Sequence, residues 1–385
     1  MYLLKFHLLF IISLCFNANI SAQISDEVFQ IDSIQELLLN HRIQDSSNVA
    51  SAYYEIGRKY RTLQEIDSSY LHFHKAEELF KRLGDNFELA QTIYEIAKIQ
   101  TNQKDYTGSE VTSVKVLDLL DNENQTDKVI RLKSYVYNNL GIVFNELVLY
   151  DESIKYHKVS IDLKKQLDGD NQFITNSSLS NLAFVYKNSK QYSLALDLYS
   201  QILSNKLIRN EYPGFYALNL DNYANTLYLS NQRDELPELY LKALRICDSI
   251  GNTSSNYKTI IINQHLAEYY NDIGNKDSAK YYSYKAKDLS QEYFNDDLLK
   301  SLRLLSKIEE GDLAVKHLED YIKLSDSLQK NERATRNKFY KIRYDSDQLL
   351  KRNKQISKER SWLLIISVVL IMASFFNICY YHAKK

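Results

Sequence analysis

The stretch YYEIGRKY at residues 53–60 sets a pattern that the chain repeats five more times. In each copy a large residue is followed by a small one, and three positions further on a large residue usually returns. The small residues are Gly57, Ala97, Gly141, Ala183, Ala224 and Ala267. The steps between them are 40, 44, 42, 41 and 43 residues, so the middle of the chain is an internal repeat.

A second mark follows each small residue at a fixed distance. Twelve positions on, the chain has Ser69, Ser109, Ser153, Ala195, Leu236 and Ala279, of which only Leu236 is large. Sixteen positions on, it has the large residues Phe73, His157, Tyr199 and Tyr240 in four of the six copies. Small residues let two antiparallel helices approach closely, and large ones fill the space beside them. Short polar stretches such as NQKD and NSKQ separate the two marks, so each copy is predicted to be a helix–turn–helix.

Composition supports helices. There are 9 Gly and 2 Pro in 385 residues, whereas sheet proteins need both at many turns. Lys and Arg total 48 and Asp and Glu total 49, so overall charge favours neither nucleic acid nor an acidic partner.

The pattern resembles the tetratricopeptide repeat, in which large-small-x-x-aromatic marks the first helix and small-x-x-x-aromatic marks the second. The resemblance covers residues 48–325, and a degenerate further unit at 298–324 places Ala314 and Leu318 in its second helix. The sequence departs from the family by lacking the opening Trp and the helix-ending Pro, and its step is longer than 34 residues. The resemblance implies an all-α superhelical solenoid of helix pairs whose concave groove binds peptides or protein segments.

Both ends of the chain are apolar. Residues 1–22 have the order of a secretory signal peptide, with Lys5, an apolar stretch and a cleavage site after Ala22. An uncleaved anchor and lipidation at Cys15 are the alternatives. Residues 361–381 are long and apolar enough for a transmembrane helix, with Trp362 at one end. The full expected order is a signal peptide at 1–22, capping helices at 23–47, about six to seven extended repeats at 48–325, a basic juxtamembrane helix at 326–360, a transmembrane helix at 361–381 and a tail at 382–385.

A signal peptide and one span predict a single-pass membrane protein with its repeats outside the cytoplasm, on the periplasmic side of the inner membrane in a Gram-negative cell. The flanking charges conflict with this orientation. Residues 351–360 are strongly basic, whereas only Lys384 and Lys385 follow the span, and a basic flank normally stays inside. We favour the signal peptide because it acts before the last span is made.

Residues 330–360 hold eleven basic and four acidic residues and neither Gly nor Pro, so they predict one long helix. This helix has three interpretations: a solvated face, contact with anionic lipid head groups, or a coiled coil that makes a homodimer.

No catalytic motif was found, so we predict that the chain is not an enzyme and has no cofactor. His72 and His74 lie two apart on a helix and cannot share a metal, so no metal site is predicted. Nucleic acid is not an expected partner. The candidate partner-binding residues lie one turn to either side of the small residues, with ordinary surface residues as the competing interpretation. They are Tyr54, Arg58, Tyr94, Lys98, Asn138, Asn181, Asn222 and Asn225.

These features favour a membrane-anchored scaffold or adaptor that binds protein or peptide partners. The alternative comes from a second resemblance, to the extracytoplasmic sensor half of bacterial signalling regulators with tetratricopeptide repeats. The sequence lacks their C-terminal effector, which leaves a sensor acting through a separate effector, or a truncated transcriptional regulator or histidine kinase. A cytosolic adaptor held by its tail is a third hypothesis, which the basic flank favours.

Overall fold

The protein is helical throughout the part that is described. The computed structural model describes residues 28, 30–35, 46–169, 171–251, 253–291 and 295–383, and no strand occurs among them. The predicted signal peptide and most of the predicted capping helices lie outside the described residues. By its internal contacts the chain divides into two compact units, a first unit of residues 1–83 with 336–385 and a second unit of residues 84–335.

The first unit contains one complete repeat. Its helices are α2 (Ser46–Thr62) and α3 (Ile66–Leu83), which pack against each other. The two backbones approach closely at Gly57, where a Cβ atom would lie 2.9 Å from the ring of Phe73. The large residue sixteen positions after the small one therefore fills the space that the small residue leaves.

The same unit includes the later part of α16 (Gly311–Ala383). The ring of Phe339 stacks on that of Tyr70 with centroids 4.3 Å apart and planes 13° apart, and Phe339 is almost fully buried. Lys338 forms an ion pair with Asp67 beside this stack. The long helix is thus attached to the first repeat by aromatic packing and one ion pair.

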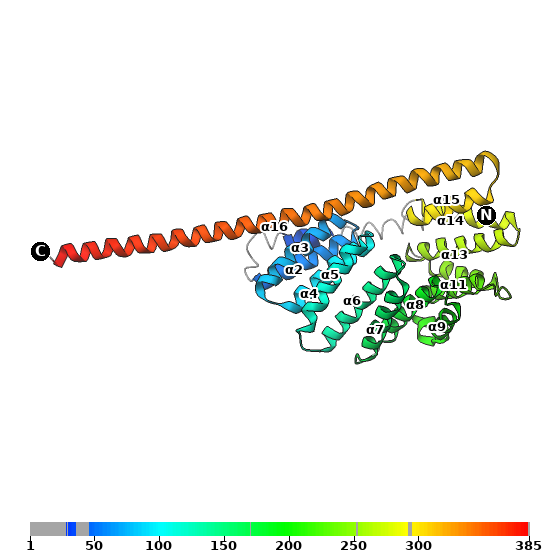
Figure 1. Ribbon diagram of the computed structural model, residues 1–385, viewed down its shortest axis with the longest axis horizontal. Coiled ribbons are helices and arrows are strands. Elements are labelled where there is room, and N and C mark those ends of the chain that lie inside the picture. The colour runs from blue at the N-terminus through cyan, green and yellow to red at the C-terminus, as the bar shows by residue number, and fades with distance from the viewer. Residues whose placement is uncertain are drawn as a thin grey trace, which may run out of the picture. The chain divides into compact units, whose positions relative to one another are not determined.

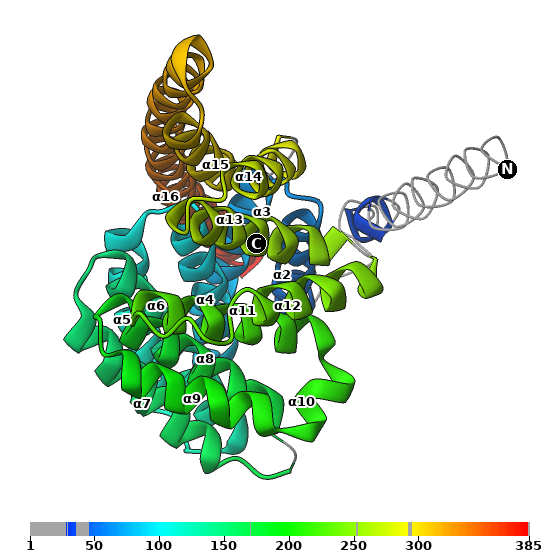
Figure 2. The same ribbon diagram turned by 90° about the vertical axis from the view of Figure 1, so that its right-hand side faces the viewer.

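The second unit is a run of helix pairs that contact one another in chain order (Figures 1 and 2). Its helices are α4 (Asn86–Asn102), α5 (Tyr106–Asp121), α6 (Asp127–Glu146), α7 (Tyr150–Lys165), α8 (Gln172–Asn188), α9 (Tyr192–Ser204), α10 (Lys206–Glu211), α11 (Pro213–Leu229), α12 (Glu238–Ile250), α13 (Thr253–Asp272), α14 (Lys276–Ser290), α15 (Asn295–Ile308) and the start of α16. The first helices of the pairs, α4, α6, α8, α11, α13 and α15, also contact one another. These first helices form the inner row of a solenoid.

In three repeats, a hydrogen bond explains why a small residue returns twelve positions after the small residue of the first helix. A buried serine at the start of the second helix donates its hydroxyl to the carbonyl oxygen of the small residue in the first helix. The pairs are Ser69 to Gly57 (2.7 Å), Ser109 to Ala97 (2.9 Å) and Ser153 to Gly141 (2.6 Å). The small residue lets the second helix come close to the backbone of the first helix. The serine hydroxyl is then near enough to donate a hydrogen bond to that backbone.

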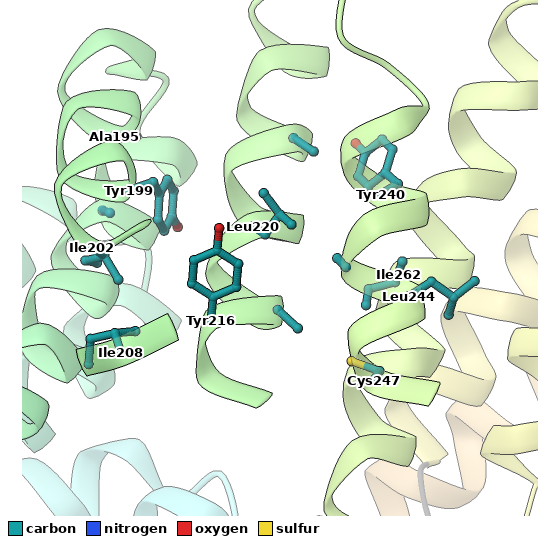
Figure 3. Close-up of a cluster of buried hydrophobic side chains, with 14 of the residues drawn as sticks. Ala195, Tyr199, Ile202, Ile208, Tyr216, Leu220, Tyr240, Leu244, Cys247 and Ile262 are labelled. Carbon is teal, nitrogen blue, oxygen red and sulfur yellow. The ribbon is translucent and has the colours of Figure 1, made fainter. Parts of the chain in front are cut away.

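The larger apolar core of the second unit lies between α7 and α13 (Figure 3). Figure 3 shows Tyr199 of α9 pointing toward α11, which contributes Tyr216 and Leu220. Tyr199 and Tyr240 are completely buried and belong to this cluster. The large residues found sixteen positions after the small ones are therefore core residues.

The turns within the pairs share one backbone conformation. Each has a residue with a left-handed φ, between 59° and 79°. These residues are Gln64, Lys104, Val148, Lys190, Asn231, Gly274 and Gly311. Asp105 and Asn275 follow two of these turns as N-caps and accept the backbone N–H of Gly108 and Ser278. Polar residues of these turns thus cap the second helices by accepting their free backbone N–H groups.

The fifth repeat departs from the pattern at Leu236. Helix α12 begins at Glu238, so the residue twelve positions after Ala224 precedes the helix. Pro237 stands directly before the helix, where its missing N–H costs no hydrogen bond. The carbonyl oxygen of Leu236 instead accepts the Tyr269 hydroxyl at 3.1 Å.

Helix α16 contains the predicted transmembrane segment. Among the described residues, no helix has an apolar run long enough to cross a membrane. The side chains of residues 373–383, which include the second half of the predicted span, lie outside the described part. The transmembrane prediction is therefore not confirmed.

Candidate functional site

Polar side chains join neighbouring first helices along the inner row. They come from positions on the first helices that reach the neighbouring repeat, and Thr101 also bonds to Ser109 on the second helix of its own repeat at 2.7 Å. The bonds are Thr101 to Asn139 (3.1 Å), Asn181 to Asn138 (3.1 Å), Lys187 to Asn222 (2.9 Å), His265 with Asp221 (2.9 Å) and Gln264 to Ser301 (3.0 Å). Each junction between repeats from α4 to α15 therefore carries at least one hydrogen bond between side chains.

Three of the four predicted asparagines, Asn138, Asn181 and Asn222, belong to this row. The Asn138 side-chain oxygen accepts from both Asn181 and Ser178, and that of Asn222 accepts from Lys187. Asn225 is 5% exposed. The amides of Asn138, Asn181 and Asn222 connect repeats to one another, so much of their hydrogen-bonding capacity is used within the fold.

Tyr94 and Lys98 also interact within their own unit. The Tyr94 hydroxyl donates to the carbonyl oxygen of Tyr135 at 3.3 Å. The Lys98 ammonium lies 2.7 Å from a Glu95 carboxylate oxygen and 4.9 Å from the centroid of the Tyr94 ring. Both side chains lie on α4, where the Lys98 ammonium faces the Tyr94 ring.

The two predicted residues of the first unit differ in exposure. Tyr54 is 8% exposed and packs edge-on against Phe73, with centroids 5.6 Å apart. Arg58 is exposed and its guanidinium lies 3.2 Å from Glu55 one turn away. Tyr54 is thus a core residue, and the periodic pattern alone could not separate the core face from the groove face.

The second unit contains a cavity of about 900 Å³. Its walls come from the α4–α5 turn, the end of α6, the start of α13, α15 and the first part of α16. The lining residues are Asn102, Gln103, Lys104, Glu146, Tyr257, Asn295, Asp296, Asp297, Leu299, Lys300, Arg303, Tyr321, Leu328, Asn331, Glu332 and Thr335. None of the eight predicted site residues is among them.

The cavity wall has opposite charges arranged in pairs. Lys104 is held between Asp296 and Glu332, at 2.8 and 2.9 Å. Burial alone would lower the pKa of the Lys104 ammonium, but the hydrogen bonds and charges of these two carboxylates outweigh it and raise the pKa. Lys104 therefore stays protonated at neutral pH.

Other charged groups complete the wall. Lys300 lies 3.5 Å from Asp297, whose pKa is raised by burial. Glu146 accepts the hydroxyl of Tyr106 at 3.4 Å, and burial together with Glu146 raises the pKa of that hydroxyl to about 12. The Arg303 guanidinium has no hydrogen bond or ion pair to any described residue, although the Arg303 backbone carbonyl accepts the Ser306 hydroxyl at 2.8 Å. An arginine in this position offers five N–H donors to a ligand.

Buried charge also lies within the inner row, on α8, α11 and α13. Burial lowers the pKa of Lys187 to about 8, although Asp221 opposes the shift. Asp221 is fully buried, and His265 meets its two oxygens at 2.9 and 3.0 Å through Nδ1. No group of three His, Cys, Asp or Glu among the described residues could hold a metal ion. The buried charges of Lys187, Asp221 and His265 suit rigid positioning of the inner helices.

Sequence reasoning missed the cavity for a physical reason. Its walls join Lys104 to residues 192 and 228 positions further along the chain, and no periodic signal marks a contact of that range. Lys104 stands in one of the polar turns, but Lys190 occupies the equivalent turn position and does not line the cavity. Only the curvature of the solenoid determines that Lys104 lines the cavity and Lys190 does not.

No protein-family model and no curated protein matches the sequence. Solved structures do match, at identities of 12–15%. A Rap protein complexed with Competence and Sporulation Factor has a TM-score of 0.58 at 12% identity and covers 78% of this chain and 80% of its own. The apo form of RapI has a TM-score of 0.57 at 12% identity and covers 72% and 96%.

A third structure is the Rap conjugation gene regulator of plasmid pLS20 in complex with the Phr* peptide. It has a TM-score of 0.53 at 15% identity and covers 73% of this chain and 74% of its own. At these identities the likeness concerns the fold. With the repeated helix pairs described above, it shows that the chain is a tetratricopeptide-like helical-repeat protein.

Proposed function

We propose that the protein is a scaffold that binds a peptide or protein segment, and that the cavity of the second unit is the binding site. The cavity is the observation that carries this proposal. Its volume of about 900 Å³ lies in the range of sites that enclose much of a ligand. Its wall combines tyrosines and leucines with paired charges and with the Arg303 guanidinium, which has no partner within the described part of the chain. This combination suits the mixed chemistry of a peptide.

The similar structures support a peptide rather than a small metabolite. Two of them were solved with a bound factor or peptide, as their names state. Inner-row helices held together by side-chain hydrogen bonds provide a rigid wall, which reduces the entropy lost when a ligand binds. Positioning of this kind needs no catalytic group, so the proposal is a binding function and not an enzyme.

The binding proposal predicts a loss of affinity when Arg303 is replaced. Short random peptides displayed on phage are selected on the full chain in detergent, and enriched peptides are measured by calorimetry. We expect Arg303→Ala to weaken their binding by roughly tenfold or more, because a charged hydrogen-bond donor leaves the cavity wall.

The matched control is Arg245→Ala on α12, an exposed arginine outside the cavity lining. This variant should bind the same peptides as the unchanged protein. Failure to enrich any peptide over an unrelated protein would contradict the binding function. Equal losses for the two variants would contradict its location in the cavity.

We further propose that α16 anchors the protein in a membrane. From Trp362 to Met372, the large apolar side chains of this helix are 51–68% exposed on every side. A helix that is apolar all round needs an apolar environment. The orientation with the repeats outside the cytoplasm remains part of this proposal.

Topology is tested with alkaline phosphatase fused after Lys330, green fluorescent protein fused after Lys385 in a second chain, and sequencing of the mature N-terminus. Active phosphatase and a first residue of Gln23 are the expected results. An inactive phosphatase with an intact Met1 would instead favour the cytosolic adaptor held by its tail.

A sensor that acts through a separate effector is the alternative function. One observation favours it: α16 runs without interruption from Gly311 to Ala383, and residues of its early part line the cavity. A continuous helix can transmit a displacement along its axis. Crosslinking of the full chain in its own membranes would then trap a second polypeptide whose yield changes when an enriched peptide is added.

A further inference from the structure

The position of Lys104 suggests which chemical group the cavity receives. Its ammonium contacts carboxylates from two different helices, Asp296 on α15 and Glu332 on α16. All three residues line the cavity. Two carboxylates that converge on one ammonium form a site for a primary amine or a guanidinium.

The contact of Lys104 with Asp296 and Glu332 is partly exposed to solvent. The side chains of Lys104, Asp296 and Glu332 are 35%, 59% and 34% exposed. Ion pairs with this exposure are individually weak and are screened by salt. The turn that carries Lys104 lies between α4 and α5, whereas both partners belong to the other end of the second unit. A contact of this kind can be exchanged for another cation without unfolding either helix pair.

The other charged side chains of the cavity wall indicate whether the bound ligand group is positive or negative. The cavity wall contains the carboxylates of Glu146, Asp296, Asp297 and Glu332, and the cations of Lys104, Lys300 and Arg303. Asp297 has Lys300 as its partner. If Lys104 moves away, Asp296 and Glu332 lose their cation and the wall becomes more acidic. The vacated position then attracts a positive group.

We propose that Asp296 and Glu332 receive a cationic group of the peptide ligand, an ammonium or a guanidinium, and that Lys104 occupies their site in the unliganded protein. This inference rests on the proposed peptide-binding function and specifies how that site is regulated. Lys104 acts as an internal competitor, so the ligand binds only to the fraction of molecules in which the lysine has been displaced.

The test compares three variants of the full chain in detergent, each selected in parallel against short random peptides on phage. Lys104→Gln removes the competitor, and the double variant Asp296→Asn with Glu332→Gln removes the receiving carboxylates. Lys190→Gln is the matched control, because Lys190 has the same left-handed turn conformation but lies outside the cavity lining. All substituted side chains are partly or fully exposed, so the fold should be retained, which circular dichroism checks.

The unchanged protein and Lys190→Gln should enrich peptides that carry Lys or Arg. Lys104→Gln should bind the same peptides roughly tenfold more tightly, since no conformational competition remains. The double variant should lose the preference for basic residues while still binding peptides through the rest of the cavity. Hydrogen exchange without any ligand should also become faster in residues 295–308 of Lys104→Gln and stay unchanged in Lys190→Gln.

Two results would overturn the inference while leaving the proposed function intact. One is an enriched set with no excess of Lys or Arg. The other is Lys104→Gln binding no more tightly than Lys190→Gln. If the unchanged protein enriches no peptide, the proposed function and this inference both fail.

Discussion

Replacing Tyr199 by alanine should lower the free energy of unfolding by about 4 kcal/mol. Tyr199 is completely buried on α9 and belongs to the core cluster with Tyr216 and Leu220 of α11. Figure 3 shows its ring between these two helices. Truncation removes the contacts of a whole aromatic ring and leaves a cavity, because helices fixed by neighbouring repeats can collapse only partly.

The matched variant is Tyr199→Phe. The Tyr199 hydroxyl is buried without a hydrogen-bond partner among the described residues, and burial followed by the charge of Asp221 raises its pKa. Removing this hydroxyl should change stability by no more than about 0.5 kcal/mol, since no hydrogen bond is broken. Urea unfolding followed by circular dichroism gives both values. Similar losses for alanine and phenylalanine would show that the hydroxyl, and not ring packing, stabilises this core.

The repeats were predictable because they depend on local geometry. The small residue in the first helix and the mark twelve positions later touch across one tight turn, as Ser153 and Gly141 do. Every repeat must solve the same packing problem within about forty residues, so the solution returns at a constant offset. The exception at Leu236 reflects a later start of α12, which the letters around Pro237 do not fix in advance.

The candidate site was less predictable because it depends on curvature. Positions one turn from each small residue were expected to face a groove, and Asn138 and Asn181 do lie on the inner row. There they bond to each other across the junction between repeats. Whether such a position meets a neighbouring helix or solvent depends on the angle between successive pairs. That angle is a sum of small packing differences and leaves no single sequence signal.

The charged wall of the cavity was even harder to predict from the sequence, because it also depends on the curvature of the solenoid. Lys104, Asp296 and Glu332 come from segments that no motif connects, and each is unremarkable in its own helix or turn. A polar turn predicts solvent exposure, and solvent exposure is what Lys190 has. The solenoid must bend far enough for the α4–α5 turn to meet α15 and α16 before the lysine acquires its partners.

The substitution Gly141→Ala should cost about 3 kcal/mol in the free energy of unfolding, although alanine is the better helix former. A Cβ atom at this position would lie 2.6 Å from the imidazole ring of His157. His157 is 1% exposed, and burial, with Lys164 nearby, lowers its pKa to about 3, so the ring is neutral and closely packed. Moving the buried ring away from an added Cβ atom would therefore require neighbouring side chains to shift as well.

Gly214→Ala is the matched control. Gly214 also lies in a helix of the second unit, but an added Cβ atom would meet its nearest side-chain atom, on Ile250, at the ordinary distance of 3.5 Å. This variant should be stabilised by up to about 1 kcal/mol, because alanine loses less backbone entropy on folding. Opposite signs for two Gly→Ala changes in one protein would isolate the close approach as the cause.

The double variant Gly141→Ala with His157→Ser tests the pairing directly. The second repeat already combines Ala97 with Ser113 at the same two positions, so the two helices can pack with these side chains. The loss in the double variant should be smaller than the sum of the two single losses, by at least about 1 kcal/mol. Strictly additive losses would mean that the ring and the glycine do not constrain each other, and that the sixteen-residue offset records something other than their contact.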